Sequence, residues 1–211
     1  MILKMKELIA GMKTRRYSMS FTTGGLFRGE SVKLATLFLE WNDWKAVRER
    51  VLSDNLLQAR TLNTSKRVCT EIISRLKKLD PGQIDLLVHG GPREQGYLLW
   101  IAVCRRYRFI ADFAVEIVRE RYLSLQNDLP YEEFDSFFNK KSEWHPEMEN
   151  IRPSTRQKLR QVLFKILREA DLLTAENTLN AAMLSPRLLE VIAPDRRDSI
   201  AFFPVFETDS G

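Results

Sequence analysis

YLLWIAVC, residues 97–104, is the most apolar run of the chain, and it is followed at once by Arg105 and Arg106. A helix needs about 20 apolar residues to cross a bilayer, so this run is too short to span one. The surrounding residues 94–125 predict the longest helical region of the chain, apolar nearly all round in its first half and kinked near residues 105–108. We therefore expect its first half to be the central helix of a packed core.

Helical periodicity recurs on both sides of this central region. Apolar residues at helical spacing predict helices after Ser31 and Asp43, and further helices at 84–88, 131–140 and 185–192. Residues 14–29 lack this spacing and contain three glycines, so they are interpreted as an irregular arm. For residues 174–184 a minor β-hairpin or wing and a short helix both stay open. The sequence thus predicts an all-α, compact globular multi-helix fold.

The chain of 211 residues is 44% hydrophobic, which is enough for a packed core without disulfides or metals. We expect an N-terminal extension (1–16), an N-terminal helical half (17–92) and a C-terminal helical half (93–211), with one core shared by the two halves. Cys69 and Cys104 fall on apolar helix faces, which favours free thiols in a reducing, cytoplasmic compartment. The N-terminus lacks the pattern of a cleavable signal, and we expect no membrane association.

Positive charge is concentrated in two segments. Residues 60–78 contain six Lys or Arg and one acid, and residues 152–168 contain six and no acid, whereas the net charge of the whole chain is +5. Each segment forms a helix with one apolar stripe, and each follows an earlier helix and a polar turn, which resembles a helix-turn-helix element. The predicted contact residues on the polar faces are Lys66, Arg67, Thr70, Ser74, Lys77, Lys78, Ser154, Thr155, Arg156, Lys158, Gln161, Lys165 and Arg168.

Solvation of a surface helix is the simplest explanation of a charged face. Two features favour polyanion binding instead. The two faces lack the interspersed acids that solvated helices use for ion pairs. They also carry Ser, Thr and Gln, which can donate to phosphates or to base edges. We expect the cations to contact phosphates and the polar side chains to make closer contacts.

No arrangement typical of catalysis is found in the sequence. His89 and His145 have no second ligand at metal-binding spacing, and no glycine-rich phosphate loop or nucleophile elbow is present. Glu132, Glu133 and Asp135 form the one tight acidic cluster, which we interpret as a solvated helix face. We therefore expect a protein that is not an enzyme, with no metal, no cofactor and no small-molecule substrate.

Several long stretches resemble the BrxA family of bacteriophage exclusion (BREX) systems, from Tyr17 to Pro204. They include FTTGGLF (21–27), DNLLQARTLNTSKRVCTEIISRL (54–76), YLLWIAVCRRYRFIADFAVEIVRERY (97–122), FDSFFNKKSEWH (134–145), STRQKLRQVLFKILREADLL (154–173) and SPRLLEVI (185–192). The resemblance implies an all-helical fold with two helix-turn-helix-like elements that binds double-stranded DNA. It also implies a system that methylates host DNA and blocks phage replication, in which other components carry the methyltransferase and ATPase activities.

The sequence therefore predicts a non-enzymatic DNA-binding accessory protein of a BREX phage-defence system, with other BREX components as partners. Two alternatives remain. The basic faces could dock acidic surfaces of other defence components, which would make the chain an assembly adaptor. They could also bind RNA, because a basic helical face does not distinguish duplexes well. A nuclease built on Glu132 and Asp135 ranks last.

Overall fold

The computed structural model describes residues 16–193 and 196–206. The first half contains α2 (Arg28–Trp41), α3 (Trp44–Ser53), α4 (Leu62–Leu76) and α5 (Pro81–His89). The second half contains α6 (Pro92–Arg106), α7 (Arg108–Phe113), a π-helical stretch (Ala114–Arg119), α8 (Glu120–Leu123), α9 (Tyr131–Ser142), a 3-10 turn (Pro146–Met148), α10 (Pro153–Glu169), α11 (Pro186–Val191) and α12 (Arg196–Ile200). The predicted all-α fold is confirmed. Apart from Arg16, the expected N-terminal extension lies outside the described residues.

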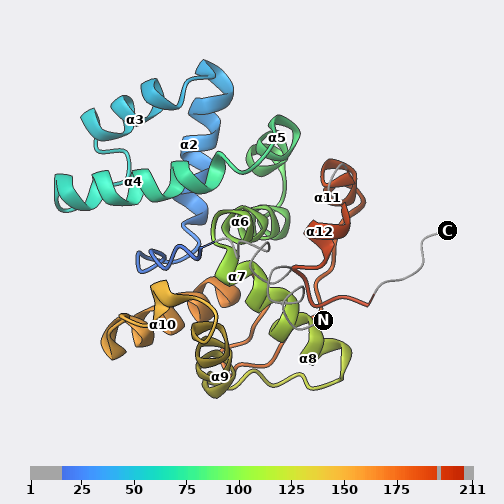
Figure 1. Cartoon of the computed structure of the whole chain (residues 1–211). Coiled ribbons are helices and arrows are strands. Elements are labelled where there is room, and N and C mark those ends of the chain that lie inside the picture. The colour runs from blue at the N-terminus through green and yellow to red at the C-terminus, as the bar shows by residue number, and fades with distance from the viewer. Residues whose placement is uncertain (1–15, 194–195, 207–211) are drawn as a thin grey trace, which may run out of the picture.

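Helix α6 lies at the centre of the fold, as its apolar composition predicts. Every residue from Gly96 to Cys104 is buried, and α6 contacts α2, α4, α5, α7 and α10. Figure 1 shows α6 between the α2–α4 group and the α9–α10 pair. Tyr107, with φ −123° and ψ 95°, separates α6 from α7, which confirms the predicted kink. Across the described residues, no helix is long and apolar enough to cross a membrane.

Helices α2, α3 and α4 contact one another and form the upper group in Figure 1. The side chain of Asp43 caps α3 by accepting a hydrogen bond from the Lys45 amide. Thr61 caps α4 in the same way, accepting from the Thr64 amide. The first basic helix therefore begins at Leu62, because the hydroxyl of Thr61 accepts from an amide of its first turn.

The second basic helix and the C-terminal segments follow the predicted pattern. Helix α9 buries Phe134, Phe137 and Phe138, and α10 buries one complete apolar stripe: Leu159, Val162, Leu163, Phe164, Ile166 and Leu167. Helix α11 is capped by Ser185. The tail packs back onto α6, where Trp100 Nε1 donates to the carbonyl of Phe202 at 2.9 Å.

The expectation of a hairpin or wing at residues 174–184 is wrong. In the described chain this region contains two isolated antiparallel bridges, Asp128–Thr178 and Leu173–Leu179, and no strand. No strand forms because the backbone amides of this region donate to two different neighbouring segments. Asn180 N donates to Leu172 O at 3.0 Å, whereas Leu179 N donates to Asn127 O at 2.6 Å. The backbone is thus shared between two neighbours, and neither pairing extends into a ladder.

Candidate nucleic-acid interface

An open groove of about 700 Å³ lies between α4 and residues 17–27, a segment called the arm from here on. The arm corresponds to the irregular segment that the sequence predicts. The groove is lined by Ser20, Thr22, Thr23, Asn63, Lys66, Arg67, Thr70, Glu71, Ser74 and Arg106. The structure therefore brings four of the predicted contact residues together, namely Lys66, Arg67, Thr70 and Ser74. It adds the arm residues, Asn63 and Arg106, which sequence reasoning missed.

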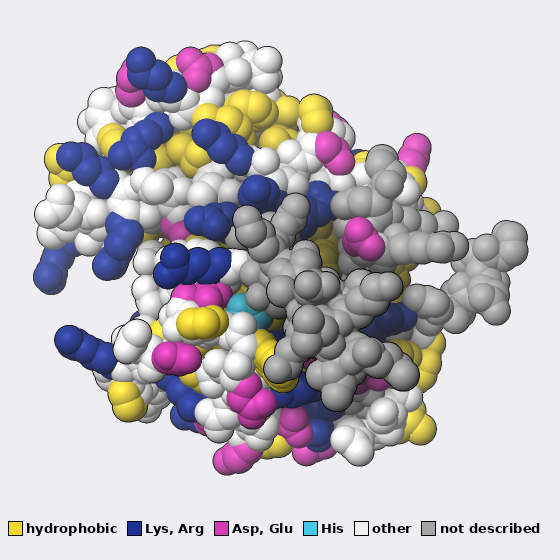
Figure 2. Space-filling view, in the orientation of Figure 1, with side chains coloured by type: hydrophobic (Ala, Val, Ile, Leu, Met, Phe, Trp, Pro, Cys, Tyr) yellow, Lys and Arg dark blue, Asp and Glu magenta, His cyan; other side chains and the backbone are white. Residues whose placement is uncertain are grey.

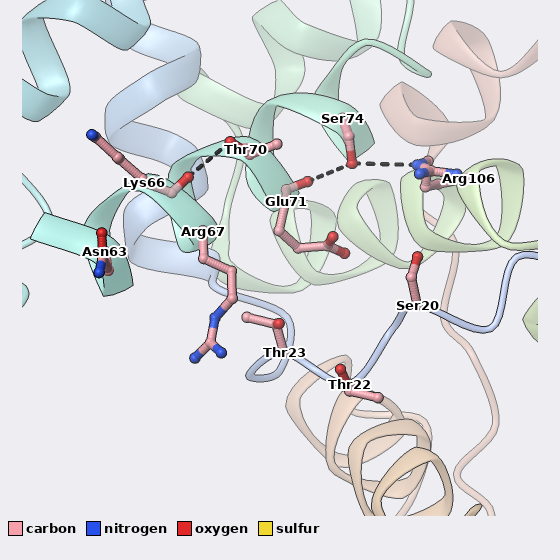
Figure 3. Close-up of a pocket in the computed structure, with 10 residues that line it drawn as sticks. All are labelled: Ser20, Thr22, Thr23, Asn63, Lys66, Arg67, Thr70, Glu71, Ser74 and Arg106. Atoms are coloured by element: carbon pink, nitrogen blue, oxygen red, sulfur yellow. Dashed lines mark hydrogen bonds between the residues drawn. The ribbon is translucent and has the colours of Figure 1, made fainter. Parts of the chain in front are cut away.

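Lys66 and Arg67 are the unpaired cations of this groove. Both side chains are exposed, and no hydrogen bond or ion pair with any described residue engages either of them. Figure 3 shows Arg67 extending from α4 toward the arm, where Thr22 and Thr23 lie. The hydroxyls of these two threonines are likewise without a partner among the described residues. The groove thus combines unpaired positive charge with unpaired hydroxyls, a combination suited to an anion with several oxygen atoms.

The hydroxyls of Thr70 and Ser74 already have partners. Thr70 Oγ1 donates to the Lys66 carbonyl at 2.8 Å and accepts from Arg48 Nη1 at 2.6 Å. Ser74 Oγ donates to the carbonyl of Glu71 at 2.8 Å and accepts from Arg106 Nε at 3.3 Å. These two predicted contact residues therefore hold the surface of α4 in place, and a ligand would have to exchange their partners to use them.

Among the described residues that line the groove, Glu71 is the one acid, and its charge is compensated by side chains beneath it. Arg75 Nε donates to its carboxylate at 2.7 Å, and the Tyr107 hydroxyl donates to the two oxygens at 2.7 and 2.8 Å. Burial and the hydrogen bond to this carboxylate raise the pKa of Tyr107 to about 12. Because Glu71 is only 13% exposed and already paired, the groove presents a positive face to solvent.

Arg75 counts toward the basic segment in the sequence but is not on the surface, because its side chain is 2% exposed. The sequence contains a signal for this position: Arg75 follows Val68 by seven residues and precedes Leu79 by four, which places it on the apolar side of the helix. Its Nη1 donates to the carbonyl of Gly25 in the arm at 2.7 Å. Lys77 and Lys78, just beyond the end of α4, are exposed.

The polar face of α10 is free only in part. Ser154, Lys158 and Gln161 are exposed, and Thr155 is half-buried. Lys165 is 55% exposed and lies 3.6 Å from the carboxylate of Glu169. In the figures α10 lies across a notch from α4, and Figure 2 shows Lys and Arg side chains on both sides of that notch, along the left edge of the molecule.

Two predicted contact residues of α10 instead connect elements of the fold. Arg156 donates to Asp135 Oδ1 at 2.9 Å and to Asn139 Oδ1 at 2.8 Å, which joins α10 to α9. Arg168 donates to Asn177 Oδ1 at 2.5 Å and to the Tyr131 hydroxyl at 3.1 Å. These hydrogen bonds lower the number of cations that α10 can offer to a ligand.

The acidic cluster on α9 is only in part the solvated face that the sequence suggests, because Glu132 is exposed whereas Glu133 and Asp135 are half-buried. Glu133 pairs with Arg121 at 2.5 Å, and Asp135 pairs with both Arg156 and Arg160. Half-burial against neighbouring helices explains this, because cations on those helices reach the carboxylates. In the ranges that the structure describes, no group of three His, Cys, Asp or Glu side chains could hold a metal ion.

The fold and the groove together define a class, that of small all-helical proteins with an open cationic groove. The sequence model of the BrxA family matches residues 15–195, and the chain belongs to this family. It is 31% identical over 147 residues to the BREX protein BrxA of Escherichia coli O9:H4, covering 70% of this chain and 69% of that one. The BREX protein BrxA of Paramagnetospirillum magneticum is 26% identical over 167 residues, covering 79% and 84%.

A solved structure has the same fold. The crystal structure of an uncharacterized protein from Magnetospirillum magneticum superimposes with a TM-score of 0.77 at 21% identity, covering 90% of this chain and 98% of that one. The family resemblance expected from the sequence is therefore confirmed by the family match and the curated relatives, and the helical architecture by a solved structure.

Proposed function

We propose that the chain is a non-enzymatic, DNA-binding component of a BREX phage-defence system, and that its groove holds the phosphate chain of duplex DNA. One observation carries the proposal: Lys66 and Arg67 line the groove unpaired, and Arg67 extends toward the unpaired hydroxyls of the arm, while Glu71 is neutralised by Arg75. Cations placed in this way bind phosphates by releasing condensed counterions from the nucleic acid.

The α10 side of the notch contributes a second set of contacts. Lys158 and Gln161 on α10 are exposed, and Lys165 has only a surface ion pair, which is worth little. A duplex that lies along the notch would have α4 and the arm on one side and α10 on the other. The relatives are named BREX proteins, so the other BREX components are the expected protein partners.

The test is a salt titration of binding to a short duplex, to the matching single strand and to the matching RNA duplex. The logarithm of duplex affinity should fall against the logarithm of salt with a slope of about −4, since four contacts (Lys66, Arg67, Lys158, Lys165) each contribute about −0.9. Duplex affinity that does not change with salt contradicts the proposal. Preferential competition by the RNA duplex would move the assignment to RNA.

A second candidate function is an assembly adaptor. The observation that favours it is another hollow, of about 540 Å³, which lies between α2 and the α3–α4 connection and is lined in part by Leu37 and Leu56. An adaptor should co-purify with other BREX components after nuclease treatment while binding duplex DNA no more tightly than an unrelated basic protein. Loss of co-purification on nuclease treatment argues against it.

A further inference from the structure

The arm is fixed to the body of the protein at both ends. At its start, the Tyr17 ring stacks on His145 at 3.8 Å and its hydroxyl donates to Asp112 at 2.5 Å. The amide of Tyr17 donates to Glu147 at 2.5 Å. In the middle, the Phe21 side chain is completely buried. The arm therefore has a defined position relative to the helices and forms one side of the groove.

At its far end, the Leu26 side chain is buried, and one peptide group of the arm is bonded to both basic helices. Arg75 Nη1 of α4 donates to the carbonyl of Gly25 at 2.7 Å, and the amide of Leu26 in the same peptide donates to the carboxylate of Glu169 at the end of α10. The fit is close, because a Cβ on Gly25 would lie 2.3 Å from Glu169 Oε2. The peptide therefore joins the two basic helices.

We propose that Glu169 is a positioning residue for the groove, and that the arm it holds presents the hydroxyls of Thr22 and Thr23 to the phosphate chain that Arg67 contacts. Both threonines line the groove and have no partner within the described chain. Groups that are ordered before binding cost less to immobilise when the ligand arrives. The inference rests on the proposed function and extends it, because α10 then controls a site that Glu169 itself does not line.

A purely electrostatic role and a positioning role for Glu169 predict opposite effects on DNA affinity when its carboxylate is removed. The substitution Glu169→Ala raises the net charge by one and releases Lys165 from its ion pair. A purely electrostatic role therefore predicts tighter binding to DNA. Positioning predicts weaker binding, roughly three- to tenfold, because the arm side chains must then be ordered on binding. Glu176→Ala is the matched control: it makes the same change in charge at an exposed acid with no described partner, and it should leave affinity unchanged or slightly higher.

The experiment measures duplex affinity and amide hydrogen exchange of the arm for the wild type, Glu169→Ala, Glu169→Gln and Glu176→Ala. Glutamine keeps an oxygen that can accept from the Leu26 amide, so Glu169→Gln should retain arm protection and bind at least as tightly as the wild type. Glu169→Ala should lose protection at Leu26 and bind more weakly. The double variant Thr22→Val/Thr23→Val should also bind more weakly, with arm protection unchanged.

The outcomes separate the two proposals. If the wild type binds duplex DNA and Glu169→Ala binds as tightly or more tightly, the positioning role is overturned and the proposed function stands. If the wild type shows no salt-dependent binding, both are overturned. If Glu169→Ala does not fold, Gly25→Ala serves in its place, since its Cβ meets the same carboxylate; unchanged affinity in that variant overturns the inference.

Discussion

Arg75 and Glu169 bind opposite ends of the same peptide group, one at the carbonyl of Gly25 and the other at the amide of Leu26. Each residue belongs to a different basic helix, yet neither lines the groove. Both residues bond to backbone groups of an irregular segment. Without them these groups would be buried with no hydrogen-bond partner, because the segment has no helix or sheet to supply one. The arrangement fixes the arm relative to α4 and α10 and so gives the groove its second wall.

Loss of Arg75 should be costly for stability. Arg75→Met removes the hydrogen bond to Gly25 and leaves the half-buried carboxylate of Glu71 with the Tyr107 hydroxyl as its remaining partner. Breaking one partner of a buried ion pair typically costs about 3 kcal/mol or more, so we expect a loss of about 3 kcal/mol in the free energy of unfolding. Chemical denaturation measures it. The control Arg67→Met, at an exposed unpaired position, should change stability by no more than about 0.5 kcal/mol. Equal effects of the two substitutions would contradict this account of Arg75.

The cations of α10 should separate into two kinds. Arg156 is 26% exposed, bonds to Asp135 and Asn139, and lies over the Phe138 ring at 4.6 Å. Arg156→Ala should therefore lower the free energy of unfolding by about 1–2 kcal/mol. Lys158→Ala should leave stability unchanged and weaken duplex binding. Thermal unfolding and a binding titration on these two variants distinguish the structural cation from the ligand-binding one. A loss of stability in Lys158→Ala, with none in Arg156→Ala, would contradict these two roles.

Acid should weaken the contact between α6 and α11. The hydrogen bond from Ser185, and then that from the Gly91 amide, lower the pKa of Glu94. A carboxyl whose pKa is lower in the folded than in the unfolded state stabilises the folded protein at pH values above the unfolded pKa, which is about 4.3 for glutamate. This contribution disappears as the pH falls through the folded-state pKa. The free energy of unfolding, measured from about pH 6 to pH 3, should therefore decline less in Glu94→Gln than in the wild type. An identical decline in that variant would contradict the role of Glu94.

The helices are predictable from the sequence because their signals are local. Apolar spacing predicts α10, and the apolar composition of residues 97–104 predicts the central position of α6. Even the exceptional burial of Arg75 follows from its position between Val68 and Leu79 on the helix.

The groove is not predictable in the same way, because one of its two walls comes from a segment without periodicity. The arm gains its structure from distant partners: Asp112 and Glu147 for Tyr17, and Glu169 for Leu26. Pairing of Arg156 with Asp135 is also non-local, so the sequence suggests a free cation and a free acid where the fold contains an ion pair. Only the tertiary structure shows which charges remain available for a ligand.

The central claim is that unpaired cations of α4 bind phosphates in the groove. Its most direct test compares the salt dependence of duplex binding for the wild type, for Lys66→Gln/Arg67→Gln, and for the control Lys33→Gln/Lys45→Gln, which loses the same charge from α2 and α3. The slope of log affinity against log salt should become shallower by about 2 in the α4 variant, because two phosphate contacts are lost, and should stay unchanged in the control. Equal slopes in all three proteins would contradict it.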